Sequence, residues 1–170
     1  MMGTCMYDAS VPVLRQMLGS LDAILEKAER HAAKRHIEPA ALLQSRLFPD
    51  MFTLSRQVAI ACHFARSVAT ELAVVDAPQA KHAGDSFADL RALVAEALRV
   101  VAALTPAQFE GSEQREVTVH AGTPHEGRFS GEKYLLHYAM PQFFFHVTTA
   151  YALLRHAGVE IGKRDFLGKF

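Results

Sequence analysis

The stretch YLLHYAMPQFFFHVTTAYALLRHAG, residues 134–158, decides how the rest of the chain is interpreted. Up to Leu154 it carries no Lys, Arg, Asp or Glu, yet it contains two histidines, a proline and a glutamine. Such a stretch allows three interpretations: a membrane span, a metal-binding helix, or a buried helix with hydrogen-bonded polar groups. It holds more polar groups than a typical span, and no other stretch of the chain resembles one. We therefore expect a helix of a soluble protein.

Length and composition indicate one globular domain, which we place over residues 1–170. The chain has 170 residues, of which 50% are hydrophobic and 21% are charged, so a disordered protein is excluded. Lys+Arg and Asp+Glu number 18 each and no basic stripe is apparent, so we expect neither nucleic acid nor a membrane as a partner. The first residues lack the pattern of a signal peptide, and two cysteines at no motif spacing fit a reducing compartment. We expect a cytoplasmic protein.

Four helical patterns and one strand-like segment organise the chain. Apolar residues recur every three or four positions over residues 11–34, 52–73, 86–104 and 131–158. Ser10 and Ser86 precede two of these patterns as predicted N-caps, and Gly158 is a fitting left-handed residue after the last one. Between the third and fourth patterns, residues 116–120 alternate polar and apolar side chains, and residues 125–129 are their expected partner strand. The sequence predicts an all-α four-helix bundle with a small β-hairpin between the third and fourth helices.

The two histidines of the opening stretch are not predicted to bind one metal ion. His137 and His146 are nine residues apart, which places them on roughly opposite faces of a helix at about 100° per residue. The chain contains neither HxxxH nor HExxH, the strongest sequence signals of a zinc-binding helix. Pro141 lies between them, and its ring would clash with the carbonyl group of His137 in a regular α-helix. We expect a break or kink there that separates two helical pieces.

His146 is the polar residue that we expect to face the interior of the bundle. It lies in the middle of a narrow sector of the fourth helix that also contains Gln142, and a buried imidazole needs hydrogen-bond partners. Gln142, a buried water, or Gln57 at the margin of the second helix's apolar stripe are the expected partners; a pocket-lining or ligand-binding role is the alternative. The candidate residues of this polar pocket are His146, Gln142, Gln57, Tyr138 and His137.

The remaining reactive side chains give no sequence signal of a catalytic site. His63 shares the polar face of the second helix with Arg56 and Arg66, which predicts a solvated or interface histidine. Cys62 has no basic partner that is obvious from spacing, which favours a structural thiol over a nucleophile. The motifs GxSxG, GxxxxGKS/T, GxGxxG and CxxC do not occur.

The fourth helix has a second apolar face, well round from His146. A helix that is apolar nearly all round is either central or packed on both sides. Because isologous dimers are the commonest oligomers, we expect a homodimer that uses this face. The alternative is that the N-terminal arm or the C-terminal tail covers it within one chain. The candidate interface residues are Phe144, Val147, Tyr151 and Leu154.

Three stretches carry a resemblance to a known family. MYDASVPVLRQMLGSLDAIL (6–25), LFPDMFTLSRQVAIA (47–61) and the segment from Tyr134 to Gly168 resemble the domain-of-unknown-function family 1993. That family belongs to the DinB/YfiT-like group of four-helix bundles, so the resemblance implies this fold and favours a dimer. It implies no activity, because the family is uncharacterised.

The wider DinB-like group implies a metal site that this chain matches only in part. Some members are thiol-dependent S-transferases or isomerases whose divalent metal is held by one histidine of the second helix and an HxxxH pair of the fourth. His146 resembles the second histidine of that pair, but Gln142 and Gln57 stand where the other two are expected. An amide oxygen is a weak ligand for Zn²⁺ or Ni²⁺. We therefore expect no metal cofactor and a pocket that binds a small molecule; the alternative is a metal-dependent transferase or hydrolase with a degenerate site that uses His146.

Overall fold

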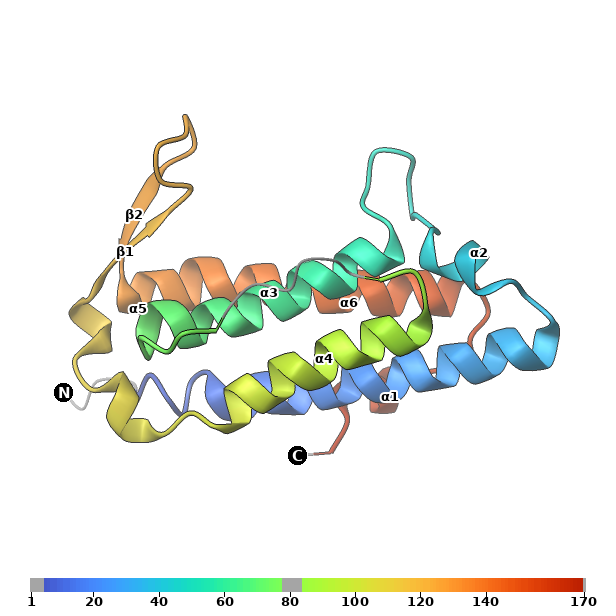
Figure 1. Cartoon of the computed structure of the whole chain (residues 1–170), viewed down its shortest axis with the longest axis horizontal. Helices are drawn as coiled ribbons and strands as arrows, with labels where there is room; N and C mark the ends of the chain where they lie inside the picture. Colours follow the sequence, from blue (N-terminus) through green and yellow to red (C-terminus); the bar gives the residue numbers. More distant parts are fainter. Residues whose placement is uncertain (1–4, 78–83, 170) are drawn as a thin grey trace.

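Four long helices lie side by side in the computed structural model, which describes residues 5–77 and 84–169 (Figure 1). α1 packs most extensively against α4, and α3 against α6, while α3 also packs on α4. α3 and α4 run in the same direction, so the bundle is not a simple up-and-down array. The four helices are α1 (Val11–Arg35), α3 (Leu54–Leu72), α4 (Phe87–Ala102) and α6 (Met140–His156).

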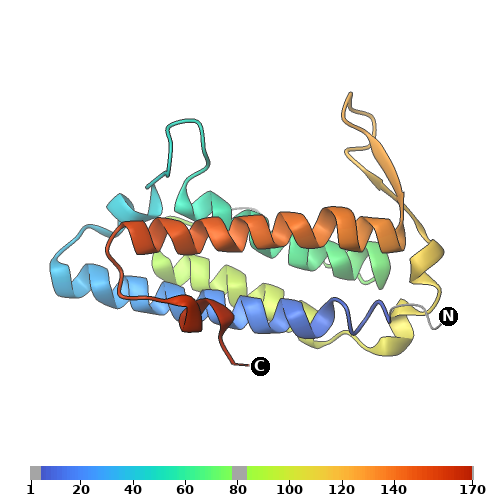
Figure 2. The ribbon, with the colours of Figure 1, turned by 180° about the vertical axis from the view of Figure 1, so that it is seen from behind.

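Short elements connect these helices, and two connections project from the bundle. The β1–β2 hairpin and the segment between α2 and α3 rise from the α3/α6 side at opposite ends (Figures 1 and 2). The hairpin is antiparallel, with Glu116 opposite Ser130 and Val119 opposite Gly127. The predicted helical bundle with a hairpin before the last long helix is therefore confirmed. The short elements are α2 (Pro39–Leu43), η1 (Pro106–Phe109), η2 (Ser112–Gln114), β1 (Glu116–Val119), β2 (Gly127–Ser130), α5 (Gly131–Lys133), η3 (Tyr134–Ala139) and α7 (Lys163–Leu167).

Side-chain caps fix the starts of two long helices. Thr53 accepts a hydrogen bond from the Arg56 amide at the start of α3, and Ser86 accepts one from the Asp89 amide at the start of α4. Ser10 precedes α1 but does not cap it, because its hydroxyl group donates to the Met6 carbonyl at 2.7 Å. The prediction for Ser86 is confirmed and that for Ser10 is wrong, since an upstream carbonyl competes for the hydroxyl.

Pro141 is accommodated by a π-helical segment rather than by a break. The chain stays helical from Gly131 to His156, and η3 contains a backbone hydrogen bond from the Met140 amide to Leu135, five residues earlier. Pro141 then occupies the first turn of α6, where a missing amide hydrogen is tolerated. The wider turn displaces the carbonyl group with which its ring would clash in a regular α-helix. The expected separation into two helical pieces is corrected accordingly.

Arg66 is the one cation that the structure buries completely among the described residues. Its side chain is 2% exposed, and its Nε and Nη1 atoms have no hydrogen-bond partner in the described part of the chain. Glu96 on α4 is close enough for the charge of Arg66 to contribute to its lowered pKa, after the larger effect of its hydrogen bond with Arg99. Both Glu96 oxygens accept hydrogen bonds from Arg99, at 3.0 and 2.7 Å. A buried guanidinium that leaves two of its nitrogen atoms without a hydrogen-bond partner among the described residues lowers the stability of the fold.

Replacing Arg66 by Met should therefore stabilise the protein. An apolar side chain of similar length removes the desolvation cost, and we expect the free energy of unfolding to rise by about 1–3 kcal/mol. Urea denaturation followed by circular dichroism measures this change. The control Arg128→Met, on the exposed hairpin, should stay within about 0.5 kcal/mol of the parent protein. A loss of stability in Arg66→Met would show that the guanidinium makes favourable interactions in solution.

Candidate functional site

His146 on α6 forms a hydrogen bond with Gln57 on α3. His146 Nδ1 lies 2.6 Å from Gln57 Oε1, and the two residues are 6% and 1% exposed. The Gln57 amide is oriented by its nitrogen, which donates to the Phe52 carbonyl at 3.3 Å. Because the amide oxygen can only accept, Nδ1 carries the hydrogen. The lone pair of the neutral ring is therefore on Nε2.

The His146 ring stays neutral at physiological pH. Burial lowers its pKa from 6.5 to about 4, and the positive charge of Arg56 adds to this effect. Nε2 forms no hydrogen bond within the described residues, and it is not among their buried unpartnered atoms. It therefore remains available as a hydrogen-bond acceptor for water or a ligand.

Aromatic rings surround this polar pair. The Phe64 ring stacks on His146, with ring centres 6.3 Å apart and an angle of 10° between the planes. Phe145 meets the His146 ring edge-on at 5.1 Å and is 54% exposed. Phe52, whose carbonyl orients Gln57, is 50% exposed, and the Arg56 guanidinium lies over its ring. The neutral imidazole thus contacts the half-exposed Phe145 ring, and a second half-exposed ring, Phe52, and the Arg56 cation lie close to its partner Gln57 in the chain.

Tyr138 links this site to the β-hairpin. Its ring contacts Phe64 edge-on at 5.8 Å and Phe129 of β2 at 5.6 Å. Its hydroxyl group lies 3.0 Å from Nε2 of His120, which follows β1. The hairpin is therefore held against η3, the segment that leads into α6.

The structure brings together three of the five predicted pocket residues. His146 and Gln57 are in direct contact, and Phe64 joins them to Tyr138. Gln142 is half-buried, and no hydrogen bond connects it to His146 among the described residues. His137 is exposed, because the π-helical segment directs Tyr138 rather than His137 towards the bundle.

Sequence reasoning missed four contributors to this site: Phe64, Phe145, Arg56 and His120. One of them left a signal, since Phe64 lies seven residues after Gln57 and so shares its helix face. Phe145 and Arg56 are next to His146 and Gln57 in the chain but lie outside the apolar stripes, and His120 comes from a separate segment, which helix periodicity does not report.

The predicted dimer face is largely covered within one chain. Val147 and Leu154 are each 1% exposed, and Phe144 is half-buried. The Tyr151 ring packs edge-on against Phe166 of α7 at 5.6 Å. The C-terminal tail thus covers part of this face, as the alternative interpretation expected. The homodimer stays a prediction.

The residues present do not fit the three-histidine metal site of the wider group. No group of three or more His, Cys, Asp or Glu side chains within residues 5–77 and 84–169 is arranged to hold a metal ion. Gln57 occupies the position of one histidine ligand of that site, and its amide oxygen accepts a hydrogen bond that orients His146. Burial raises the pKa of the Cys62 thiol to about 12, and the charge of its neighbour Arg66 offsets this only in part. Cys62 is therefore a protonated structural thiol.

The arrangement of the helices is that of a four-helix bundle, and comparison with known proteins identifies the bundle as DinB-like. A crystal structure of a DinB family member protein from Shewanella denitrificans matches with a TM-score of 0.87 and 34% sequence identity, over 96% of this chain and 92% of that chain. The family model described as "Domain of unknown function (DUF1993)" matches residues 6–167, and the chain belongs to this family. No curated protein matches the sequence. None of the helices in the described part is long and apolar enough to cross a membrane.

The low pKa of His146 predicts a specific pH dependence of stability. Unfolded His146 binds a proton near pH 6.5, but the folded protein does so only near pH 4, so the unfolding free energy falls as the pH drops between these values. The loss is expected to reach about 3 kcal/mol, at 1.36 kcal/mol per pH unit. Denaturation curves measured from pH 7 to pH 4 should therefore show that the free energy of unfolding falls more steeply with decreasing pH for the parent protein than for His146→Phe. Parallel profiles would contradict a buried neutral imidazole.

Proposed function

We propose that this protein binds a small, partly apolar molecule at the surface above His146. The observation that carries this proposal is the oriented, neutral imidazole whose Nδ1 is held by Gln57 and whose Nε2 has no partner in the described residues. A hydrogen-bond acceptor that is held in one tautomer and one orientation is preorganised for a ligand donor.

The surroundings indicate the chemistry of the ligand. A hydroxyl or amide hydrogen would donate to His146 Nε2, and a flat apolar group would pack on the half-exposed Phe52 and Phe145 rings. The guanidinium of Arg56 over Phe52 would favour a ligand with an anionic group at that edge. A phenol or an aromatic amide combines the first two features.

The metal-dependent alternative has less support. His146 Nε2 has a free lone pair, but the chain offers Gln57 and Gln142 where a three-histidine site needs imidazoles. The Gln57 oxygen is also unavailable as a metal ligand, because it already accepts a hydrogen bond from the His146 ring. If elemental analysis of the purified protein found one tightly held divalent ion per chain, this alternative would replace our proposal.

Binding is tested with a set of small phenols and aromatic amides in ligand-observed NMR. Compounds that bind the parent protein should bind His146→Phe at least about tenfold more weakly, because the substitution removes the acceptor and keeps the aromatic volume. The control His125→Phe, at an exposed position of the hairpin connection, should leave their affinity unchanged.

A ¹⁵N spectrum of the histidine rings provides an independent readout. It should report a neutral ring with hydrogen on Nδ1 for His146 at pH 7, and a bound phenol should shift its Nε2 signal. Phenols that bind parent protein and His146→Phe with equal affinity would refute the proposed site.

A further inference from the structure

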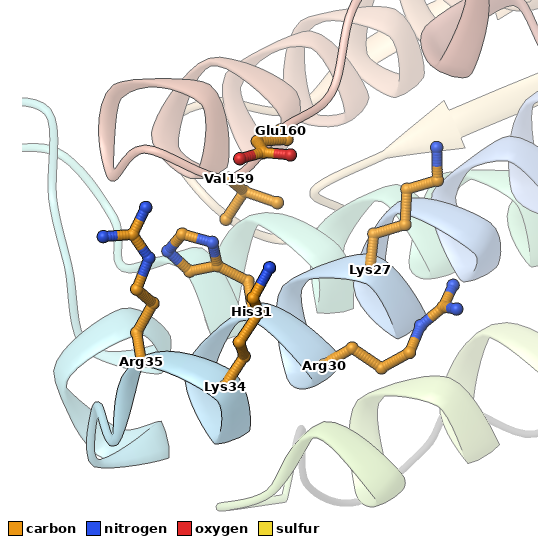
Figure 3. Close-up of a pocket in the computed structure, with 7 residues that line it drawn as sticks. All are labelled: Lys27, Arg30, His31, Lys34, Arg35, Val159 and Glu160. Carbon is orange, nitrogen blue, oxygen red and sulfur yellow. The ribbon is translucent and has the colours of Figure 1, made fainter.

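A second candidate site lies at the end of the bundle where α1 and α6 terminate, which is the opposite end from the β-hairpin (Figure 1). Its cavity has a volume of about 270 Å³ and lies between the last turns of α1 and the segment that follows α6 (Figure 3). Val159 is buried and forms its floor. We call this cavity the basic pocket; its charged and titratable lining residues are Lys27, Arg30, His31, Lys34, Arg35 and Glu160.

Two helix ends of the same kind build the basic pocket. At the end of α6, Gly158 adopts a left-handed conformation with φ 87°, and the Val159 amide donates to the Leu154 carbonyl at 3.0 Å. At the end of α1, His36 adopts φ 53°, and the Ile37 amide donates to the Ala32 carbonyl at 2.9 Å. Both are Schellman motifs, which satisfy the last carbonyl groups from the backbone. The α6 motif inserts Val159 and carries Glu160 over α1.

Positive charge in the basic pocket exceeds the negative charge that meets it. Lys27 is paired with Asp165 at 2.5 Å, and Arg30 lies 3.8 Å from Glu26. Lys34 and Arg35 form no ion pair in the described part of the chain, and neither does Glu160. Figure 3 shows the Lys34 and Arg35 side chains rising from α1 on the side where the Glu160 carboxylate lies.

Helix stability does not account for this cluster. Basic residues near a helix C-terminus are stabilising, but the effect falls off within the last turn. Lys27 and Arg30 lie further back on α1, and like charges three or four residues apart destabilise a helix by about 0.2–0.5 kcal/mol per pair. Arg30 and Lys34, which are four residues apart, form such a pair. A bound anion would relieve this repulsion.

We propose that the basic pocket binds the phosphate group of a small phosphate monoester. Lys34 and Arg35 are the unpaired cations that would meet its oxygens, with Lys27 and Arg30 completing the positive rim. The cavity is large enough for a phosphate and a small substituent. Glu160 repels an anion, so a ligand oxygen that keeps its hydrogen is favoured beside this carboxylate. The site is separate from the His146 surface and does not depend on the function proposed there.

Thermal unfolding and calorimetry with inorganic phosphate as the probe test this proposal. Phosphate should raise the melting temperature of the protein more than sodium chloride does at equal ionic strength, because a ligand of the folded state stabilises it. Lys34→Gln and Arg35→Gln should each weaken phosphate binding on the order of tenfold. The matched control Lys133→Gln, at an exposed position in α5, should bind phosphate like the parent protein.

Glu160→Gln provides a test of opposite sign. Removing the carboxylate should tighten phosphate binding severalfold, since it removes repulsion without removing a cation. An unchanged affinity in Lys34→Gln and Arg35→Gln, or no tightening in Glu160→Gln, would show that phosphate does not bind in the basic pocket. An effect of phosphate equal to that of sodium chloride would overturn the proposal as a whole.

Discussion

The hydrogen bond between His146 and Gln57 is the interaction around which the α3/α6 half of the bundle is organised. It joins the two helices that make one of the most extensive contacts in the fold, and it lies among rings from both of them. A buried polar pair is stable only when both partners meet, so it favours one register of α6 against α3 over slipped alternatives. The same bond selects the tautomer of the imidazole. One contact thus sets both the packing and the chemistry of the site.

This register requires α6 to reach α3 with the correct face, and the π-helical segment before Pro141 contributes to that. A π turn contains one more residue than an α turn, so it changes the phase of every residue that follows. His137 is exposed, while Tyr138 and His146 both contact Phe64. Pro141 therefore does not end the helix; it follows a π-helical segment that changes which residues of the fourth helix face the bundle.

The sequence was sufficient for the features that repeat along a helix and insufficient for those that join distant segments. Apolar periodicity, the cap at Ser86 and the left-handed Gly158 are local, and each was predicted correctly. The partner of His146 was one of three alternatives because Gln57 stood at the margin of its stripe. Arg66 looked solvated from its helix face, but packing buries it. The basic pocket could not be predicted from the sequence, because its cations belong to α1 whereas Val159, which forms its floor, comes after α6.

The position of Gln57 distinguishes the polar pair of this chain from a three-histidine metal site. In a three-histidine site each imidazole presents a lone pair to the ion, and a further group usually orients each ring from behind. In this chain Gln57 has the orienting role itself, since its oxygen accepts from His146 Nδ1. The lone pair on Nε2 remains on the ring, but no group of three or more His, Cys, Asp or Glu side chains among the described residues is arranged to hold a metal ion. The imidazole therefore remains a neutral hydrogen-bond acceptor with Arg56 as the cation beside it, whereas the cluster of cations on α1 lies in a separate pocket at the ends of α1 and α6.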